Sequence, residues 1–497
     1  MTSINNCPKD RVSASPRGTA PPMCVKWFLV VPLALLIVPA GCSSGNTSPS
    51  VPVLSRALPQ SGSPSQYIKN VVVIVQENRS LENFFAGYPG ANAPTSGCAI
   101  PHGSASPRTI RQVARQSSSS GCPSGDISVP LQQVTFDGVN GKNIDLQHDW
   151  YSSKVDYHKG LMDGFSRWGK GNTYPAYSYV EESLIAPYWD MAQQYVLADE
   201  MFPTEWGGSF TAHLTLVAGN DTIDQSPLES EVDFPNKVPD DCDSPPGTLS
   251  SYITSNDVEH RFQGPFPCFD QWNTMANVLD GAGISWKYYA TKVLDAGLWE
   301  PYEAMKYVRY GPDWSSDIIA PQTQVLKDAA DGNLASVTWV SPSKADSDHP
   351  AYHSDLGPSW VTSVVNAIGQ SSYWNSTAIV IVWDDWGGWY DNSKPPHLDY
   401  RGLGFRVPCL IISPYAKDGY VDHTQYEFGS ILKFIEEVYG TGSIGPTSKG
   451  YTDQRATSLD AAFDFNQKPR AFSTIPSKYP ESHFLREPPS NEPVDNE

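Results

Sequence analysis

Polar side chains that could bind a cation follow two wholly apolar segments of the sequence. The first segment, Val71–Val75, is soon followed by Glu77 and Asn78. The second ends at the adjacent acids Asp384 and Asp385. Taken singly, either pair could cap a helix or open a turn. Two adjacent carboxylates at the end of a buried strand repel each other, however, and need a cation or a shared proton, so the two pairs together predict a divalent cation site.

A serine that could attack phosphorus follows a pair of glycines. Ser209 comes directly after Gly207 and Gly208, which allow the backbone to approach a ligand closely. Apolar residues after Ser209 recur at helical spacing, which places it at or just before a helix N-terminus, where amide donors stabilise anions. The alternative is that Ser209 only caps this helix. A serine beside a cation is an activated nucleophile, so the pattern points to phosphate transfer.

Short apolar strands alternating with helices are predicted to position these residues. The strands are predicted at Val71–Val75, Ser336–Val340, Ala378–Trp383 and Val407–Ile412. Helical spacing occurs at Phe269–Leu279, Gln322–Ala330, Ser359–Ile368 and Tyr426–Val438. Continuous hydrophobicity indicates strands that are covered on both faces, and the alternation with helices indicates a mainly parallel sheet. We therefore predict an α/β sandwich, with the polar residues at the carboxyl edge of its sheet, where ligands bind.

The composition is that of a large globular protein with an acidic surface. The 497 residues are 39% hydrophobic and 12% aromatic, which is enough for a large core. With 54 acidic and 34 basic side chains the formal net charge is -20, which would repel a polyanion over most of the surface. We therefore expect no nucleic-acid partner, whereas an anionic substrate can bind where a cation reverses the local potential.

The N-terminal residues resemble a bacterial export signal. An apolar run that is too short to span a bilayer comfortably ends in small residues before Cys42. Lipidation of Cys42, ordinary cleavage and an uncleaved anchor all remain open, so the protein is expected to be periplasmic, secreted or anchored as a lipoprotein. The predicted parts are an export signal (1–42), a flexible linker (43–65), a catalytic domain (66–465) and a Pro-rich tail (466–497) that drapes over the body or is disordered.

The cysteines that follow Cys42 divide into a loop group of four and one strand cysteine. Four of them lie in or beside Ser-, Pro- and Gly-rich stretches that we expect to be surface insertions, at residues 91–130 and 221–265. Two disulfides are expected in an exported protein, with three possible pairings. The simplest joins nearest neighbours, Cys98 with Cys122 and Cys242 with Cys268. Cys409 lies in an apolar run and is expected to be a buried strand cysteine.

Several ordered motifs give the chain a resemblance to a known family. They are VVVIVQENRSLENFF (71–85), DEMFPTEWGGSFTAHLTLVAG (199–219), DHP (348–350), DDWGGWYD (384–391) and RVPCLIIS (406–413). These segments resemble the bacterial phosphoesterase family that includes secreted phospholipases C and related acid phosphatases. The resemblance implies an alkaline phosphatase-like three-layer α/β/α sandwich with loop-rich insertions. It also implies a metal site formed by Glu77, Asn78, Ser209, Asp384 and Asp385.

Further site residues follow from the same motifs. His148 and His349 lie in segments similar to the histidine-bearing loops of the family and are candidates for leaving-group protonation or phosphate contact, or else surface residues. Arg79 either meets phosphate or anchors its motif. Gly208 and Trp386 are candidate substrate contacts, although the aromatic residue could equally pack in the wall of the site.

Two residues depart from the family pattern, and one histidine is given a supporting role. Asp385 stands where many relatives have glutamate, which keeps the charge but shortens the reach. Asn392 follows Asp391 where a histidine is frequent, so no base is assigned there. His213 lies one helical turn after Ser209 and is expected to pack or to support the site.

The expected activity is metal-dependent hydrolysis of phosphate esters through Ser209 and a phosphoserine intermediate. The substrate is expected to be a small phosphate ester or a phospholipid head group, and the cofactor is a divalent metal of open identity and number. Monomers are expected, with any membrane contact limited to the lipid anchor or signal. Two alternatives remain, a surface lipoprotein that uses the fold to bind carbohydrate and a phosphotransferase on the same fold.

Overall fold

The computed structural model describes residues 62–102, 121–136, 144–226, 228–352 and 354–490. The chain divides into two compact units, residues 1–58 and 59–497, and the described residues all belong to the second. The predicted export signal, including Cys42, and most of the predicted linker lie outside the described residues. Helical structure begins with the 3-10 helix η1 (Pro64–Gln66), so the folded part starts slightly before the predicted boundary at residue 66.

A nine-stranded sheet forms the centre of the described fold. Its strand order is β12 (Ile318–Ile319), β11 (Trp286–Tyr289), β13 (Val337–Val340), β1 (Asn70–Gln76), β14 (Thr377–Trp383), β15 (Val407–Ile412), β6 (Val196–Phe202) and β16 (Tyr420–Asp422), while β17 (Tyr426–Glu427) also pairs with β6. All these pairings are parallel except those of β15, which runs antiparallel to β14 and β6. The mainly parallel sheet is therefore confirmed, with β15 as the strand of opposite direction.

The central strands are apolar throughout because both of their faces are covered. Every residue of β1 and of β14 is buried. Their parallel register pairs Gln76 with Trp383, the last residue of each strand. Since the two strands end side by side, the residues that follow them leave the sheet at the same place on its carboxyl edge.

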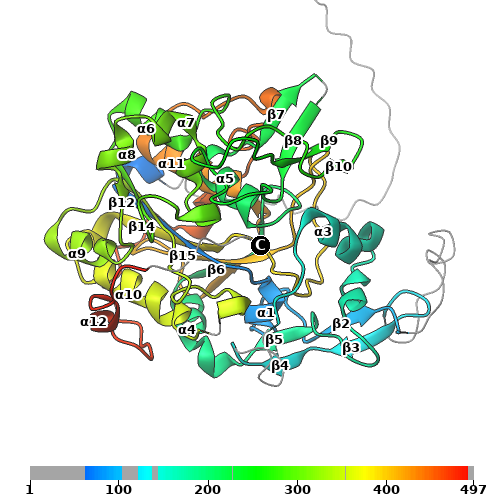
Figure 1. The fold of residues 1–497 in the computed structure, drawn as a ribbon. Coiled ribbons are helices and arrows are strands. Elements are labelled where there is room, and N and C mark those ends of the chain that lie inside the picture. Colours follow the sequence, from blue (N-terminus) through cyan, green and yellow to red (C-terminus); the bar gives the residue numbers. More distant parts are fainter. Residues whose placement is uncertain (1–61, 103–120, 137–143, 227, 353, 491–497) are drawn as a thin grey trace, which may run out of the picture. The chain divides into compact units, whose positions relative to one another are not determined.

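Helices cover both faces of the sheet. Figure 1 shows one layer formed by α4 (Ala186–Gln194), α9 (Gln324–Asp331), α10 (Gly357–Gly369) and α12 (Glu481–Phe484). The opposite layer contains α5 (Ser209–Ala218), α6 (Met275–Ala282), α7 (Lys306–Arg309), α8 (Asp313–Ser316) and α11 (Phe428–Tyr439). The three-layer α/β/α arrangement predicted from the sequence is confirmed.

The remaining helices are short. Helix α1 (Leu81–Phe85) follows β1, and helix α3 (Trp150–Tyr157) comes before α4 in the chain. The other 3-10 helices are η2 (His158–Gly160), η3 (Gly164–Trp168), η4 (Glu182–Leu184), η5 (Gly297–Trp299), η6 (Pro301–Ala304), η7 (Pro350–Tyr352), η8 (Trp374–Ser376), η9 (Thr447–Lys449) and η10 (Leu459–Ala462).

All four predicted helices begin at residues other than the predicted ones, and the difference is largest for α6. Helix α6 begins only after Thr274, whose side chain forms a capping box with Asn277, and Phe269 instead forms a bridge with Met305. The cap satisfies amide groups of the first turn, which explains why the helix starts there. In the helix predicted at Tyr426–Val438, the first two residues, Tyr426 and Glu427, instead form β17, and α11 begins at Phe428.

The insertions contain small sheets rather than loops alone. Residues 221–265 include a four-stranded antiparallel sheet in the order β10 (Val258–His260), β9 (Ser251–Thr254), β8 (Leu228–Val232) and β7 (Thr222–Gln225). In residues 91–130, β2 (Ser96–Ala99) pairs with β3 (Ile127–Pro130), and just beyond them β4 (Gln132–Val134) pairs with β5 (Ser178–Val180). Strand pairing supplies the partners that backbone polar groups of a long segment require.

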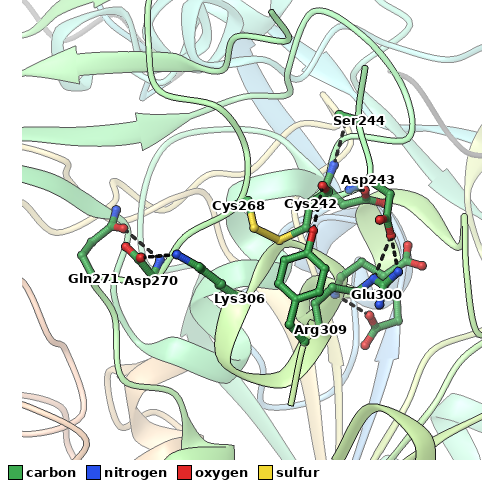
Figure 2. Close-up of a disulfide and its surroundings, with 12 residues drawn as sticks. Cys242, Asp243, Ser244, Cys268, Asp270, Gln271, Glu300, Lys306 and Arg309 are labelled. Carbon is green, nitrogen blue, oxygen red and sulfur yellow. Dashed lines mark hydrogen bonds and ion pairs between the residues drawn. A yellow bond between two sulfur atoms is a disulfide. The ribbon is translucent and has the colours of Figure 1, made fainter. Parts of the chain in front are cut away.

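Both disulfides follow the nearest-neighbour pairing. Cys98 bonds to Cys122 and Cys242 bonds to Cys268, with Cα–Cα distances of 5.5 and 4.4 Å. Figure 2 shows the second disulfide among exposed and half-buried ion pairs, Lys306–Asp270 and Arg309–Asp243. Cys409 carries a free thiol, and it is fully buried in β15 as predicted.

The described part of the C-terminal tail lies on the body. Ile475 and Phe484 are buried, and the ring of Phe484 lies 5.5 Å from that of Trp360 in α10. Among the helices that the structure describes, none combines the length and the apolar character needed to cross a bilayer.

Candidate active site and metal centre

Three strands deliver the predicted site residues to the carboxyl edge of the sheet. Glu77 follows β1 and Asp384 follows β14, which is parallel to it. Strand β6 is antiparallel to β15, as β14 is, so its carboxyl end points to the same edge and leads to Ser209. Each of these three side chains is at most 1% exposed. The structure therefore brings segments far apart in the sequence into one buried site.

A histidine completes a cluster of possible metal ligands. His213 Nε2 lies 3.1 Å from Glu77 Oε1 and 3.7 Å from Asp384 Oδ2, and all three residues are fully buried. One ligand atom from each residue lies within 4.8 Å of the others. Ser209 and His213 are four residues apart in α5 and so point to the same side of the helix. From the sequence we expected His213 to pack or to support the site, and in the structure its ring lies directly against the two acids.

The donor set fits a divalent cation. Glu77, Asp384 and Asp385 are fully buried, and Asp384 Oδ2 accepts no hydrogen bond from the described residues. Buried carboxylates at such close range are costly unless a cation offsets their charge. Oxygen ligands alone suit Mg²⁺ or Ca²⁺, whereas an added imidazole favours a transition metal such as Zn²⁺ or Fe²⁺.

Asn78 connects the acids to a histidine. Its backbone N–H donates to Asp384 Oδ1 at 2.9 Å, and its side-chain nitrogen lies 2.8 Å from His148 Nε2. Asn78 has a φ of 57°, a left-handed conformation that asparagine tolerates better than most residues. The turn at the end of β1 thereby holds the Asn78 side chain toward His148.

Ser209 is positioned by a helix and by an acid. It is the first residue of α5, with Gly208 as the N-cap. Its hydroxyl donates to Asp385 Oδ2 at 3.2 Å, while Asp385 Oδ1 accepts a hydrogen bond from the Gly387 N–H at 2.7 Å. The alternative that Ser209 is the N-cap is wrong. A hydroxyl beside the first-turn amides and an acid is placed to attack an anionic ester.

His148 has a defined protonation pattern. Its Nδ1 lies 2.6 Å from the Leu146 carbonyl oxygen, and its Nε2 faces the side-chain nitrogen of Asn78. Because an amide nitrogen can only donate, Nε2 accepts and Nδ1 carries the proton. The ring of Trp386 stands nearly perpendicular to the His148 ring at 6.2 Å.

His349 lies near His148 but is enclosed by aromatic rings. It is 2% exposed, and its ring centre lies 6.3 Å from that of His148. The rings of Tyr352 and Trp299 lie 4.7 and 6.2 Å away. The two predicted histidines are thus neighbours at the site.

Arg79 makes anchoring contacts inside the protein. Its side chain is 1% exposed, and it donates to the Asp348 carbonyl oxygen at 2.8 Å and to Asn83 Oδ1 at 3.1 Å. Burial lowers the pKa of this guanidinium to about 10. Its guanidinium also lies within 5.3 to 5.5 Å of the ring centres of Phe84, Trp389 and Phe136. These contacts fit the anchoring alternative, while the Nη2 atom has no hydrogen bond to the described residues, so the role in substrate binding stays a prediction.

A cleft of about 220 Å³ opens beside His148 and Gly208, the residue before Ser209. Its lining residues are Asp145, Leu146, Gln147, His148, Asp149, Gly208, Asp233, Phe234 and Arg261. The insertion around β7–β10 therefore contributes to the rim of the site. Trp386 is not among the lining residues, because it is buried behind His148 with its indole N–H 3.4 Å from Asp156 Oδ2.

Comparisons with known proteins agree with this arrangement. A model of the Phosphoesterase family matches residues 68–442. Non-hemolytic phospholipase C of Pseudomonas aeruginosa is 23% identical over 450 residues, which cover 82% of this chain but only 59% of that protein. Phospholipase C A of Mycobacterium tuberculosis is 25% identical over 472 residues, covering 85% of this chain and 82% of that protein.

More distant matches were also found. Non-specific phospholipase C4 of Arabidopsis thaliana is 24% identical over 427 residues, covering 76% of this chain and 69% of that protein. Among solved structures, a protein of the alkaline phosphatase superfamily from Vibrio parahaemolyticus has a TM-score of 0.36 and 10% identity, covering 80% of this chain and 74% of that one.

Proposed function

The chain belongs to the Phosphoesterase family, and from this we propose that it is a metal-dependent phospholipase C-type enzyme that hydrolyses phosphodiesters of phospholipids. The observation that carries the proposal is the buried cluster of Glu77, His213 and Asp384 beside the Ser209–Asp385 hydrogen bond. The names of the relatives favour a phospholipid diester over a soluble monoester. Smaller phosphate esters remain the second substrate class.

The metal would be held by the acids at the strand ends. Glu77, Asn78, Asp384 and Asp385 would supply oxygen ligands, and His213 would supply a nitrogen. A divalent cation bound there neutralises charge on the phosphate oxygens and makes phosphorus more electrophilic.

Ser209 is the proposed nucleophile. Its oxygen attacks phosphorus, the hydroxyl proton passes to Asp385, and the bond from phosphorus to the leaving alcohol breaks. Water then cleaves the resulting phosphoserine and restores the hydroxyl. The first-turn amides of α5 point toward the position where negative charge develops on the phosphoryl oxygens.

His148 is the better placed of the two histidines to protonate the leaving oxygen, because it lines the cleft. It could donate from Nε2 once its ring carries protons on both nitrogens and the Asn78 amide nitrogen has moved away from Nε2. His349 would support the position of His148 through the packed aromatic rings.

Export from a bacterial cell is part of the proposal. Two disulfides fit an oxidising compartment, where a phospholipase could meet lipid surfaces. The predicted lipid attachment at Cys42 would keep the enzyme on a membrane, and growth with labelled fatty acid would report it in the wild type but not in Cys42→Ala.

Hydrolysis assays test the proposed reaction. Purified protein is incubated with phospholipid micelles, an aryl phosphodiester and an aryl phosphomonoester, before and after chelation and after metal is restored. We expect metal-dependent release of phosphorylated head group, and a loss of about 10³-fold or more in kcat for Ser209→Ala. Ser316→Ala, an exposed serine in α8, is the matched control and keeps full activity.

The covalent intermediate distinguishes the mechanism from its rivals. Acid-quenched reactions are expected to contain phosphorylated Ser209, located by peptide mass spectrometry. An added alcohol that diverts most of the phosphoryl group from water would indicate a phosphotransferase. A protein that binds carbohydrate and cleaves none of the esters with metal restored would support the binding-module alternative and contradict the proposal.

A further inference from the structure

A buried acid outside the proposed metal site lies directly against the turn that carries Ser209. Glu205 is 3% exposed and precedes the sequence Trp206–Gly207–Gly208. A Cβ atom at Gly207 would lie 2.9 Å from Glu205 Oε1 and 2.9 Å from Thr211 Oγ1. The glycine therefore leaves the space that lets the Glu205 carboxyl group lie over the turn.

The hydrogen-bond donors around this carboxyl group are already in use. The Thr211 hydroxyl donates to the Gly208 carbonyl oxygen at 3.3 Å and also lies against Glu205, and its single proton can serve only one of these two acceptors at a time. Asp221 accepts from Arg401 Nη1 at 2.5 Å through its Oδ1 atom. Its Oδ2 atom is buried and has no hydrogen bond to the described residues. A proton on Glu205 would supply the donor that the Asp221 Oδ2 atom lacks.

The surrounding charges oppose ionisation of Glu205. Burial raises the pKa of its carboxyl group well above the usual value, and the charge of Asp221 and a hydrogen bond with it raise the pKa further, while a hydrogen bond with Thr211 and the charge of Arg401 lower it. Arg401 is shared with Asp399, which also pairs with Arg455. The charged groups around the turn are therefore Asp221, Glu231, Asp399, Arg401, Glu427 and Arg455.

We propose that Glu205 is a positioning residue that acts in its protonated form, holding the Gly207–Gly208 turn so that Ser209 faces the phosphate. The Glu205 proton bridges to Asp221 or to Thr211, and the Thr211 hydroxyl fixes the Gly208 carbonyl. Loss of that proton places a second negative charge beside Asp221 and loosens the turn. The serine-dependent activity would therefore fall as pH rises. This inference rests on the proposed role of Ser209.

A pH profile of kcat tests the inference with Glu205→Gln. Glutamine offers a donor and an acceptor at the same position, so it imitates the protonated acid and cannot ionise. In the wild type we expect kcat to fall by about tenfold for each pH unit on the alkaline side of the profile as Glu205 loses its proton. In Glu205→Gln we expect near wild-type kcat at acid pH and no such fall at alkaline pH. Glu205→Ala is expected to lower kcat at every pH with little change in KM.

Glu231→Gln is the matched control. Glu231 is also a fully buried acid whose pKa is raised chiefly by burial and, like that of Glu205, by the charge of Asp221, but its carboxyl group accepts a hydrogen bond from Ser250. Its pH profile is expected to match the wild type. An alkaline limb that is identical in the wild type and Glu205→Gln, or full activity of a folded Glu205→Ala protein, would overturn the inference.

Hydrogen exchange separates this inference from the proposed mechanism. Amides of residues 206–211, corrected for the intrinsic pH dependence of exchange, are expected to lose protection at alkaline pH in the wild type but not in Glu205→Gln. This readout does not depend on which residue attacks phosphorus. Activity retained by Ser209→Ala would therefore refute the mechanism alone, whereas exchange that is equal in the two proteins would refute the role of Glu205.

Discussion

At the scale of single residues, one turn of helix α5 supplies two different functional groups. Ser209 directs its hydroxyl toward Asp385, and His213, four residues later, directs its ring toward Glu77 and Asp384. Residues four apart share one face of a helix, so the spacing was a signal that could have placed the histidine beside the serine in the site. The spacing could not show that the acids following two different strands, Glu77 and Asp384, meet at this face of the helix.

The first prediction concerns the contribution of His213 to metal binding. Replacing it with alanine removes a nitrogen close to two carboxylates, so we expect metal affinity to fall by about tenfold to 100-fold. Competition with a chelating indicator dye, together with metal analysis of the purified protein, measures this without an activity assay. His483→Ala, a partly exposed histidine in α12, is the control. Unchanged affinity in His213→Ala would show that the histidine only packs against the acids.

At the scale of elements, the loops after β1 and β14 fit closely against each other. Gly387 has a φ of 59°, and a Cβ atom there would lie 2.2 Å from the Asn78 carbonyl oxygen. Its N–H also donates to Asp385, the partner of Ser209. Two glycines after the paired acids were visible in the sequence, and the structure shows that the first is needed for both conformation and space.

The second prediction compares two glycines with similar backbone conformations. Gly440 has a φ of 66° at the end of α11, and a Cβ atom added there would have no neighbouring atom within 4 Å. Gly440→Ala is therefore expected to cost only about 1 kcal/mol of stability, from the left-handed conformation. Gly387→Ala is expected to cost clearly more, measured by chemical denaturation, and to weaken metal binding. Equal effects of the two substitutions would contradict the proposed contact between the loops.

At the scale of the whole molecule, a net charge of -20 is combined with many buried acids. Burial raises the pKa of Asp233 to about 8, and it also raises the pKa values of Glu300, Glu303 and Glu436. Two of these acids, Glu300 and Glu303, belong to the segment near the disulfide in Figure 2, where Glu300 is labelled. Folding keeps such groups protonated well above the pH at which they ionise in the unfolded chain.

The third prediction is that stability decreases toward alkaline pH. An acid whose pKa is higher in the folded state than in the unfolded state contributes its full stabilisation when the pH is below its unfolded-state pKa. That stabilisation is lost as the pH rises through its folded-state pKa. The free energy of unfolding is therefore expected to fall between about pH 6 and about pH 9, with self-repulsion of the net charge adding to the effect. Urea denaturation of metal-saturated protein at each pH measures it. A stability that stays constant or rises over this range would contradict the prediction.

The sequence alone determined the α/β class, the buried central strands and the acids at their ends. Those features depend on local hydrophobic patterns, because a strand buried on both faces must be apolar along its length. The position of Ser209 at the start of a helix was likewise local. The motifs shared with relatives then predicted which strand ends belong together.

Only the tertiary structure decided which distant groups meet. The antiparallel direction of β15, the nearest-neighbour disulfides, the enclosed position of Arg79 and the contact of His213 with the acids each depend on where other segments lie. Local sequence patterns report how a segment folds and which face it buries, but contacts between segments are set by packing of the whole chain. For this reason the sequence predicted the chemical groups of the site, and the folded chain determined their partners.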